Sequence, residues 1–134
     1  MKHLFVVALF TLTSFNAQAA DQVITVTFES IANTPTKSGE KLDPTLFSFG
    51  PAVPGGEDDQ SKASSSGFGK PKDESCRWAL LASFMKFQEK AKSMKKRVVG
   101  VRTYAGNTES TSADACICLA GGIVVRSTIK ATYK

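Results

Sequence analysis

The sequence predicts an α+β fold, in which a small antiparallel or mixed sheet is covered on one face by one main helix. Three observations predict this class. Residues 22–28 alternate in the manner of a half-buried strand. Residues 74–94 carry apolar side chains at helical spacing, and residues 115–133 are rich in β-branched residues. The expected order is strand, strand, helix, strand, strand.

The first residues have the three parts of a secretory signal. Lys2 and His3 give a basic start, residues 4–12 are apolar, and residues 17–19 have a small-x-small pattern. The apolar stretch is shorter than the roughly 20 residues that a membrane-spanning helix needs. We therefore expect a signal peptide over residues 1–19, with cleavage after Ala20 as the alternative, and a periplasmic or extracellular location.

Removal of residues 1–19 leaves 115 residues, which suits a single domain over residues 20–134. It also removes His3, the only histidine of the sequence. Catalytic sites of the Ser-His-Asp or Cys-His kind, and zinc sites with imidazole ligands, are then excluded. Residues 67–70 lack the spacing of a phosphate-binding loop. We expect no catalytic residues, metal or cofactor, and hence a non-catalytic binding module with an unknown partner.

Ahead of the main helix we expect a turn or short helix around residues 36–42 and a second strand over residues 45–49. Residues 51–72 are rich in Ser, Gly, Pro and acidic residues, and offer almost nothing apolar to bury. Such a segment does not offset its ordering entropy, so it is predicted to be a long mobile loop. Its acidic residues 57–59 are expected to form a solvated patch, because the spacing of a calcium loop is missing.

The main helix is expected to be capped by Asp73 or Ser75. Behind it, residues 98–104 predict a third strand and residues 105–114 a turn. The long β-prone segment that follows contains Gly121-Gly122, which suggests a bulge or a close backbone approach.

The end of the main helix is strongly basic. One interpretation is a solvated face whose cations complement the negative helix end. The other is an anion-binding surface, which supports an alternative function: a secreted protein, directed to a host or cell envelope, that binds anionic lipid head groups or another polyanion. Nucleic acid is a poorer partner, because no exposed aromatic residues are interleaved with the cations. The candidate anion-binding residues are Lys86, Lys90, Lys92, Lys95, Lys96 and Arg97.

The chain has three cysteines, and an exported protein is able to keep disulfides. Cys116 and Cys118 are two residues apart in a predicted strand and so point to the same face. At most one of them can bridge Cys76. We favour Cys76–Cys118, and Cys76–Cys116 stays open. Cys116 is then a buried free thiol, or forms an intermolecular disulfide, or joins Cys118 in a thiol-redox or soft-metal site, which is the third candidate function.

Several segments resemble a family of small exported bacterial proteins often labelled "excinuclease ATPase subunit". The matching segments are Cys76-Arg77-Trp78-Ala79, residues 97–101, residues 118–122 and residues 130–133. More distantly, two strands resemble the YbjQ-type heavy-metal-binding domain and the Rcs stress-sensor lipoprotein. The resemblance implies a sheet packed on a helix, a binding or sensing role, and a disulfide between Cys76 and Cys118.

This sequence departs from that family at the end of the helix. Where the relatives carry Gly-Ala-Asn-Ala, this chain has residues 94–97, Met-Lys-Lys-Arg. A glycine cap is thus lost and a basic cluster gained. No ligand set for a metal carries over from the relatives.

Overall fold

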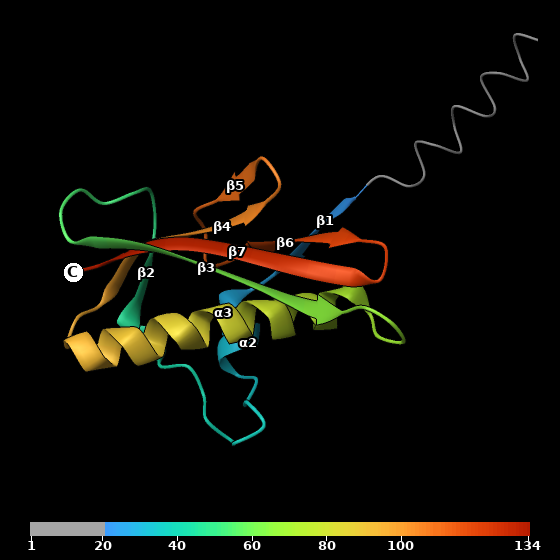
Figure 1. The fold of residues 1–134 in the computed structure, drawn as a ribbon, viewed down its shortest axis with the longest axis horizontal. Helices are drawn as coiled ribbons and strands as arrows, with labels where there is room; N and C mark the ends of the chain where they lie inside the picture. Colours follow the sequence, from blue (N-terminus) through green and yellow to red (C-terminus); the bar gives the residue numbers. More distant parts are fainter. Residues whose placement is uncertain (1–20) are drawn as a thin grey trace, which may run out of the picture.

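The computed structural model describes residues 21–134, and the predicted signal peptide lies outside the described residues. No helix of the described part is apolar and long enough to cross a bilayer. Figure 1 shows the elements in their order along the chain. Their bounds are β1 Gln22–Val26, α2 Phe28–Ala32, the 3-10 turn η1 Pro44–Leu46, β2 Phe47–Phe49, β3 Glu57–Ser66, α3 Lys72–Met94, β4 Val98–Ala105, β5 Thr108–Ser110, β6 Cys116–Gly121 and β7 Val124–Tyr133.

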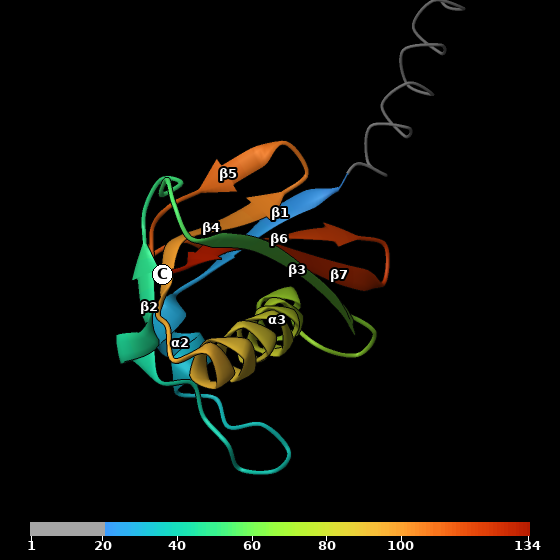
Figure 2. The ribbon, with the colours of Figure 1, turned by 60° about the vertical axis from the view of Figure 1, so that its left-hand side comes forward.

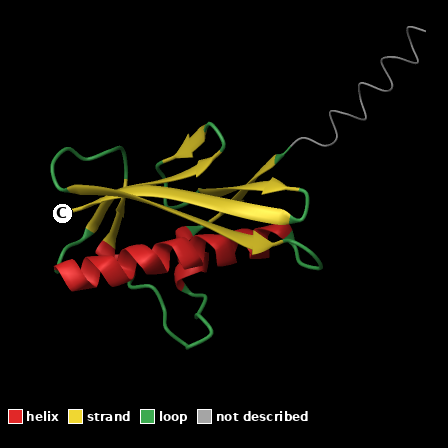
Figure 3. Cartoon of the chain, in the orientation of Figure 1, coloured by secondary structure: helices red, strands yellow, loops and turns green. Residues whose placement is uncertain are grey.

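The strands form one curled, mixed sheet, and α3 lies along one of its faces (Figure 3). The predicted α+β class is therefore confirmed. Strand β7 is central: β3 pairs with one edge over its whole length, while β6 and β4 share the other edge, one beside each half. All pairs are antiparallel except β2 with β4. Figure 2 shows how the sheet curls around the helix.

The prediction of a mobile loop over residues 51–72 is wrong for residues 57–66. These form the ten-residue strand β3, which pairs residue by residue with β7. The composition was misleading because an edge strand is held by its backbone ladder and needs few apolar side chains. Its inward positions Ser61, Ala63 and Ser65 are small, which suits a strand lying close beneath a helix.

Two other local predictions differ in part from the structure. The first strand ends at Val26, because the Thr27 hydroxyl accepts a hydrogen bond from Ser30 N (3.2 Å) and caps a new helix at Phe28. Of the two alternatives for Gly121-Gly122, the bulge is absent, but Gly121 does allow a close approach, since a Cβ there would lie 2.5 Å from Asp21 Oδ1. Gly122 has φ +62° and opens a two-residue hairpin turn between β6 and β7.

Helix α3 supplies the main layer of the core. Phe84 packs edge-to-face against Phe28 and Phe47, with ring centroids 5.1 and 5.3 Å apart. The predicted side-chain cap is absent: the helix starts after Pro71, and Ser75 is buried and donates to Ser66 O (3.0 Å). At the other end, Lys95 takes the left-handed cap conformation (φ 56°) that a glycine usually occupies.

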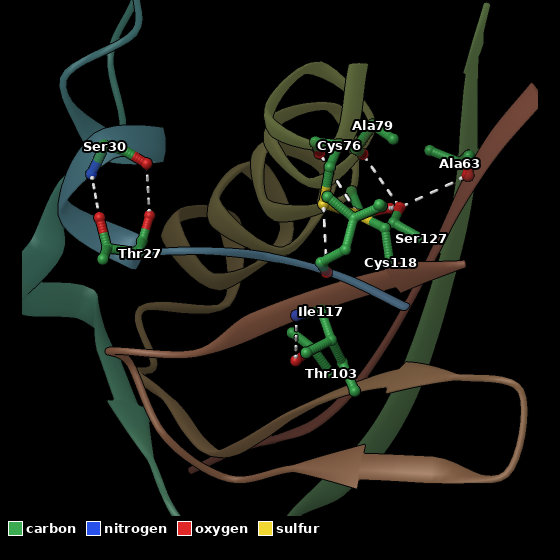
Figure 4. Close-up of a disulfide and its surroundings, with 11 residues drawn as sticks. Thr27, Ser30, Ala63, Cys76, Ala79, Thr103, Ile117, Cys118 and Ser127 are labelled. Atoms are coloured by element: carbon green, nitrogen blue, oxygen red, sulfur yellow. Dashed lines mark hydrogen bonds between the residues drawn. A yellow bond between two sulfur atoms is a disulfide. The ribbon is translucent and has the colours of Figure 1, made fainter. Parts of the chain in front are cut away.

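A disulfide joins α3 to β6. Cys76 and Cys118 are bonded with their Cα atoms 5.8 Å apart, as Figure 4 shows, so the favoured pairing is confirmed. A pair of buried hydroxyls lies beside it: Ser127 donates to Ala79 O (3.0 Å) of α3 and lies 2.9 Å from the Ser83 hydroxyl. These small side chains let the helix approach the sheet closely.

Candidate functional site

The face of the sheet that points away from α3 carries the candidate site. Along β7, Ser127 and Ile129 are buried against the helix side. Because side chains alternate across a strand, Arg126, Thr128 and Lys130 therefore point to the outer face. The same alternation on β3 turns Ser61 inward and its neighbours outward.

The register aligns these outward side chains in rows across the sheet. Lys130 stands between Gln60 of β3 and Arg102 of β4. In the next row Thr128 stands between Lys62 and Tyr104, and in the third row Arg126 faces Leu119 of β6. Successive rows are about 7 Å apart, since they are two residues apart along a strand. We call Lys62, Arg102, Arg126 and Lys130 the trough cations.

A bulge in β4 brings Arg102 into this set. The β4–β7 register shifts between Val99 and Arg102, at the point where Gly100 has φ +62°. The shift turns Val101 into the core, where it is fully buried, and leaves Arg102 pointing outward opposite Lys130. A Cβ on Gly100 would lie 3.0 Å from Pro51 O, so this position also lets the 51–53 segment approach the sheet.

The outer face is hollowed around these side chains. A hollow of about 360 Å³ lies over the three rows, a second lies toward residues 52–53, and a third lies toward Ser64. The first shares Gln60 and Lys130 with the second, and Lys62, Arg126 and Thr128 with the third. The three hollows are therefore one continuous depression, which we call the sheet-face trough.

The trough cations have no carboxylate partner. Within residues 21–134 the ion pairs join Arg77 to Asp73 and Lys90 to Glu57 and Asp59, and none includes a trough cation. Their contacts are with neutral groups. Arg102 Nε donates to Gly100 O (3.0 Å), and Lys130 Nζ lies 4.9 Å from the centroid of the Tyr104 ring.

Two acidic groups mark the borders of the trough. Glu109 accepts a hydrogen bond from the Tyr104 hydroxyl, and burial together with this bond raises the pKa of Tyr104. At the far end Asp58 accepts from Thr132 Oγ1 (2.7 Å). Glu109 is the cross-strand neighbour of Tyr104 and so ends the second row, whereas the first and third rows, as the structure describes them, contain cations and no carboxylate.

All six cations predicted at the helix end are exposed, but two of them make contacts within the chain. Lys90 Nζ lies 2.9 Å from Glu57 Oε2 and packs over the Tyr133 ring; the bond to Glu57 is the main reason that the pKa of Lys90 is raised. Arg97 donates to Thr45 O (2.9 Å) and to the Ser48 hydroxyl, and so holds the 45–48 segment. The remaining four, Lys86, Lys92, Lys95 and Lys96, are exposed.

The acidic residues 57–59 are exposed or partly exposed, in line with the prediction of a solvated patch, but they also make contacts within the chain. Glu57 and Asp59 pair with Lys90, and Asp59 accepts from the Tyr133 hydroxyl (2.9 Å). This cluster fixes the start of β3 to the helix and to β7.

The third cysteine is buried. Cys116 is 0 % exposed, and burial raises the pKa of its thiol to about 12. Because Cys118 is bonded to Cys76, the oxidised protein contains no Cys116–Cys118 thiol pair. Among the described residues, no group of three or more His, Cys, Asp or Glu side chains is placed to hold a metal ion.

Reasoning from the sequence missed the trough cations, although a signal was present. The signal concerns two of the four: Arg126 and Lys130 stand at alternate positions of a β-prone segment, with small or apolar residues between them. Cations at alternate positions of a strand share one face. Only the basic residues towards the end of the helix were interpreted as a surface.

No protein-family model, curated protein or solved structure matches this chain. The resemblance to the small exported bacterial family therefore stays a prediction, and the site rests on its own geometry.

Proposed function

We propose that this protein is an exported, non-catalytic binding module that holds an anionic partner in the sheet-face trough. The observation that carries the proposal is the convergence of four cations from β3, β4 and β7 without a carboxylate partner among the described residues. The disulfide and the expected secretory signal support export.

The pairing of Arg102 with Lys130 is the strongest element of this argument. These two side chains are direct cross-strand neighbours, and like charges in that position destabilise a sheet. An anion bound between them would replace repulsion with two charge-assisted hydrogen bonds. The bulge at Gly100 is what places Arg102 there, so the local backbone irregularity serves the charge arrangement.

The basic helix end is the second candidate surface, and three of its exposed cations support it. Lys92, Lys95 and Lys96 lie within the last turn and the cap of α3. Their charges are adequately explained by the negative end of the helix, which attracts cations. The trough has no comparable internal explanation, so it is the stronger candidate.

The thiol-redox or soft-metal candidate has the weakest support. A reactive cysteine needs an accessible thiolate, whereas burial keeps Cys116 protonated at physiological pH. We therefore assign Cys116 to the core.

Two charge-reversal variants with the same change in net charge test the proposal. The trough variant is Lys62→Glu/Arg126→Glu/Lys130→Glu, and the helix-end variant is Lys92→Glu/Lys95→Glu/Lys96→Glu. Tripolyphosphate and size-defined heparin oligosaccharides serve as probes in isothermal titration calorimetry of the oxidised protein.

The trough variant is expected to bind at least tenfold more weakly than the parent, and the helix-end variant within about twofold of it. The trough variant also loses the like-charge pair, so it should unfold at no lower urea concentration than the parent. Equal losses in the two variants would mean attraction by net charge alone and would refute the assignment. A loss confined to the helix-end variant would move the site to α3.

A further inference from the structure

We infer that the ligand of the sheet-face trough is a linear acidic glycan, an extended sugar chain bearing sulfate, phosphate or carboxylate groups. This inference rests on the proposed function and gives the chemical class of its ligand. Three features support it: the extent of the trough, the side chains between its cations, and the contacts of Tyr104, the one aromatic residue that lines the described trough.

The trough is elongated along the strands. Its three hollows follow β3 and β7 from residues 52–53 to Ser64. The stretch from Asp58 to Ser64 spans six residue steps, or about 20 Å of strand. Cations stand in three consecutive rows along it. A compact anion would contact one row, whereas an extended chain with repeated acidic groups would contact all three.

The positions between the cations suit sugar hydroxyls. Gln60, Ser64 and Thr128 line the hollows, and their side chains form no hydrogen bond within the described residues. Hydroxyl and amide side chains both donate and accept, as sugar hydroxyls do. The guanidinium groups of Arg102 and Arg126 match planar carboxylate, sulfate or phosphate groups through two parallel bonds.

Single-stranded nucleic acid fits less well, because its non-specific binding depends on bases stacked on aromatic side chains. Tyr104 is the one aromatic residue that lines the described trough. Lys130 Nζ occupies a face of its ring at 4.9 Å, and Glu109 holds its hydroxyl.

A membrane surface also fits less well. The exposed carboxylates of Asp58 and Glu109 lie on the same face as the cations. A flat anionic bilayer laid over this face would meet these carboxylates together with the cations. A slim chain is able to follow the cations between them.

The charge distribution gives the chain a preferred placement. Asp58 and Asp59 line the second hollow, whereas the first and third hollows contain cations and no carboxylate. Acidic groups of the chain should therefore lie between Lys130 and Arg126. Its neutral hydroxyls should lie toward the Asp58 carboxylate, which accepts hydrogen bonds, because the Asp59 carboxylate is held on the helix side by Lys90 and Tyr133.

The test compares the binding of four probes to the oxidised protein, with the heparin probe as a series of chain lengths. Size-defined heparin oligosaccharides represent the acidic glycan, long-chain polyphosphate is linear but has no sugar, and oligo-dT and phosphatidylglycerol vesicles represent the rival partners. Heparin affinity is expected to rise with chain length until the trough is filled and then to level off, and to exceed that of oligo-dT and of the vesicles.

The variant Thr128→Val provides a readout that charge alone would not move. It removes one hydroxyl from the trough floor and keeps a β-branched shape suited to a strand. Heparin binding should weaken about fivefold, the usual effect of one lost hydrogen bond, while polyphosphate binding stays unchanged. Equal effects on the two polymers, or none on either, would refute recognition of a glycan.

The two levels of the proposal fail differently. The glycan is refuted if tripolyphosphate binds as tightly as the longest heparin chain, or if oligo-dT or the vesicles bind more tightly than heparin. The trough remains an anion site in that case if the trough variant abolishes the binding. Absence of binding to every anion refutes both.

Discussion

At the scale of single residues, the protein places charged groups and thiols in opposite environments. Arg102 and Lys130 stand side by side on the outer face, where water screens their repulsion. Cys116 stands in the core with no exposed surface. An ionised thiolate there would lose its hydration, which is why burial raises the pKa of Cys116 to about 12.

This shift predicts a loss of stability in alkali. The thiol pKa is about 12 in the folded chain and near its ordinary value of 9.0 when the chain is unfolded. The unfolded chain therefore releases its proton first, so the free energy of unfolding is at its full value below pH 9 and falls as the pH rises toward 12. Between pH 8 and pH 10, the free energy of unfolding measured by urea titration should fall by about 1 kcal/mol less in Cys116→Ala than in the parent.

The effect of Cys116 is isolated by comparing how steeply the free energy of unfolding falls with pH in the two proteins. The raised pKa of the buried Tyr133 acts in the same direction, but it acts in both proteins. The variant also carries a small cavity, which lowers its stability equally at every pH. Parallel pH profiles for the two proteins would show that Cys116 is accessible to water.

At the scale of elements, the sequence predicted those whose side chains show a period. The alternation that begins at Gln22 and the helical spacing in α3 were enough to predict a strand and the covering helix. Strand β3 was not predictable in this way. Its Ser-rich sequence carries no hydrophobic period, and the ladder with β7 that holds it is a long-range property of the fold.

The candidate site likewise contains residues whose direction the sequence pattern could predict and one whose direction it could not. The alternation from Arg126 to Lys130 was readable, because it lies in a β-prone segment. The outward direction of Arg102 was not, since unbroken alternation from the buried Val98 would have turned Arg102 into the core. The bulge at Gly100 reverses this, and a glycine in a strand indicates such a bulge only in general terms.

The bulge predicts a coupled effect of Gly100→Ala. An alanine would be strained at φ +62°, and its Cβ would lie 3.0 Å from Pro51 O. We expect the free energy of unfolding to fall by at least about 1 kcal/mol, measured by urea denaturation. Anion binding should weaken as well, because relaxation of the bulge moves Arg102 away from Lys130.

Gly122→Ala is the matched control for this variant. Gly122 also has a positive φ (+62°), but a Cβ there would meet nothing within 4 Å, and the residue does not line the trough. It should therefore cost some stability through backbone strain and leave the pairing of Arg102 unaltered. If both variants bind anions like the parent, the bulge does not position the site.

At the scale of the whole molecule, one covalent link holds the two layers together. Cys76 lies near the start of α3, and Cys118 lies in β6, which also pairs with β1. The bond joins residues 42 positions apart, and thus restricts a large part of the unfolded chain. In the chain-entropy model a loop of this size stabilises the fold by about 3–4 kcal/mol.

The double variant Cys76→Ala/Cys118→Ala should therefore lose about 3–4 kcal/mol in the free energy of unfolding, measured by urea denaturation without reductant. Domains of this size are typically stable by about 5–15 kcal/mol, so the bond is expected to be a large share of the total. Cys116→Ala in the same assay keeps the bond and should show only the cost of its cavity. If the double variant were as stable as the parent, packing of α3 on the sheet would suffice to hold the layers without the bond.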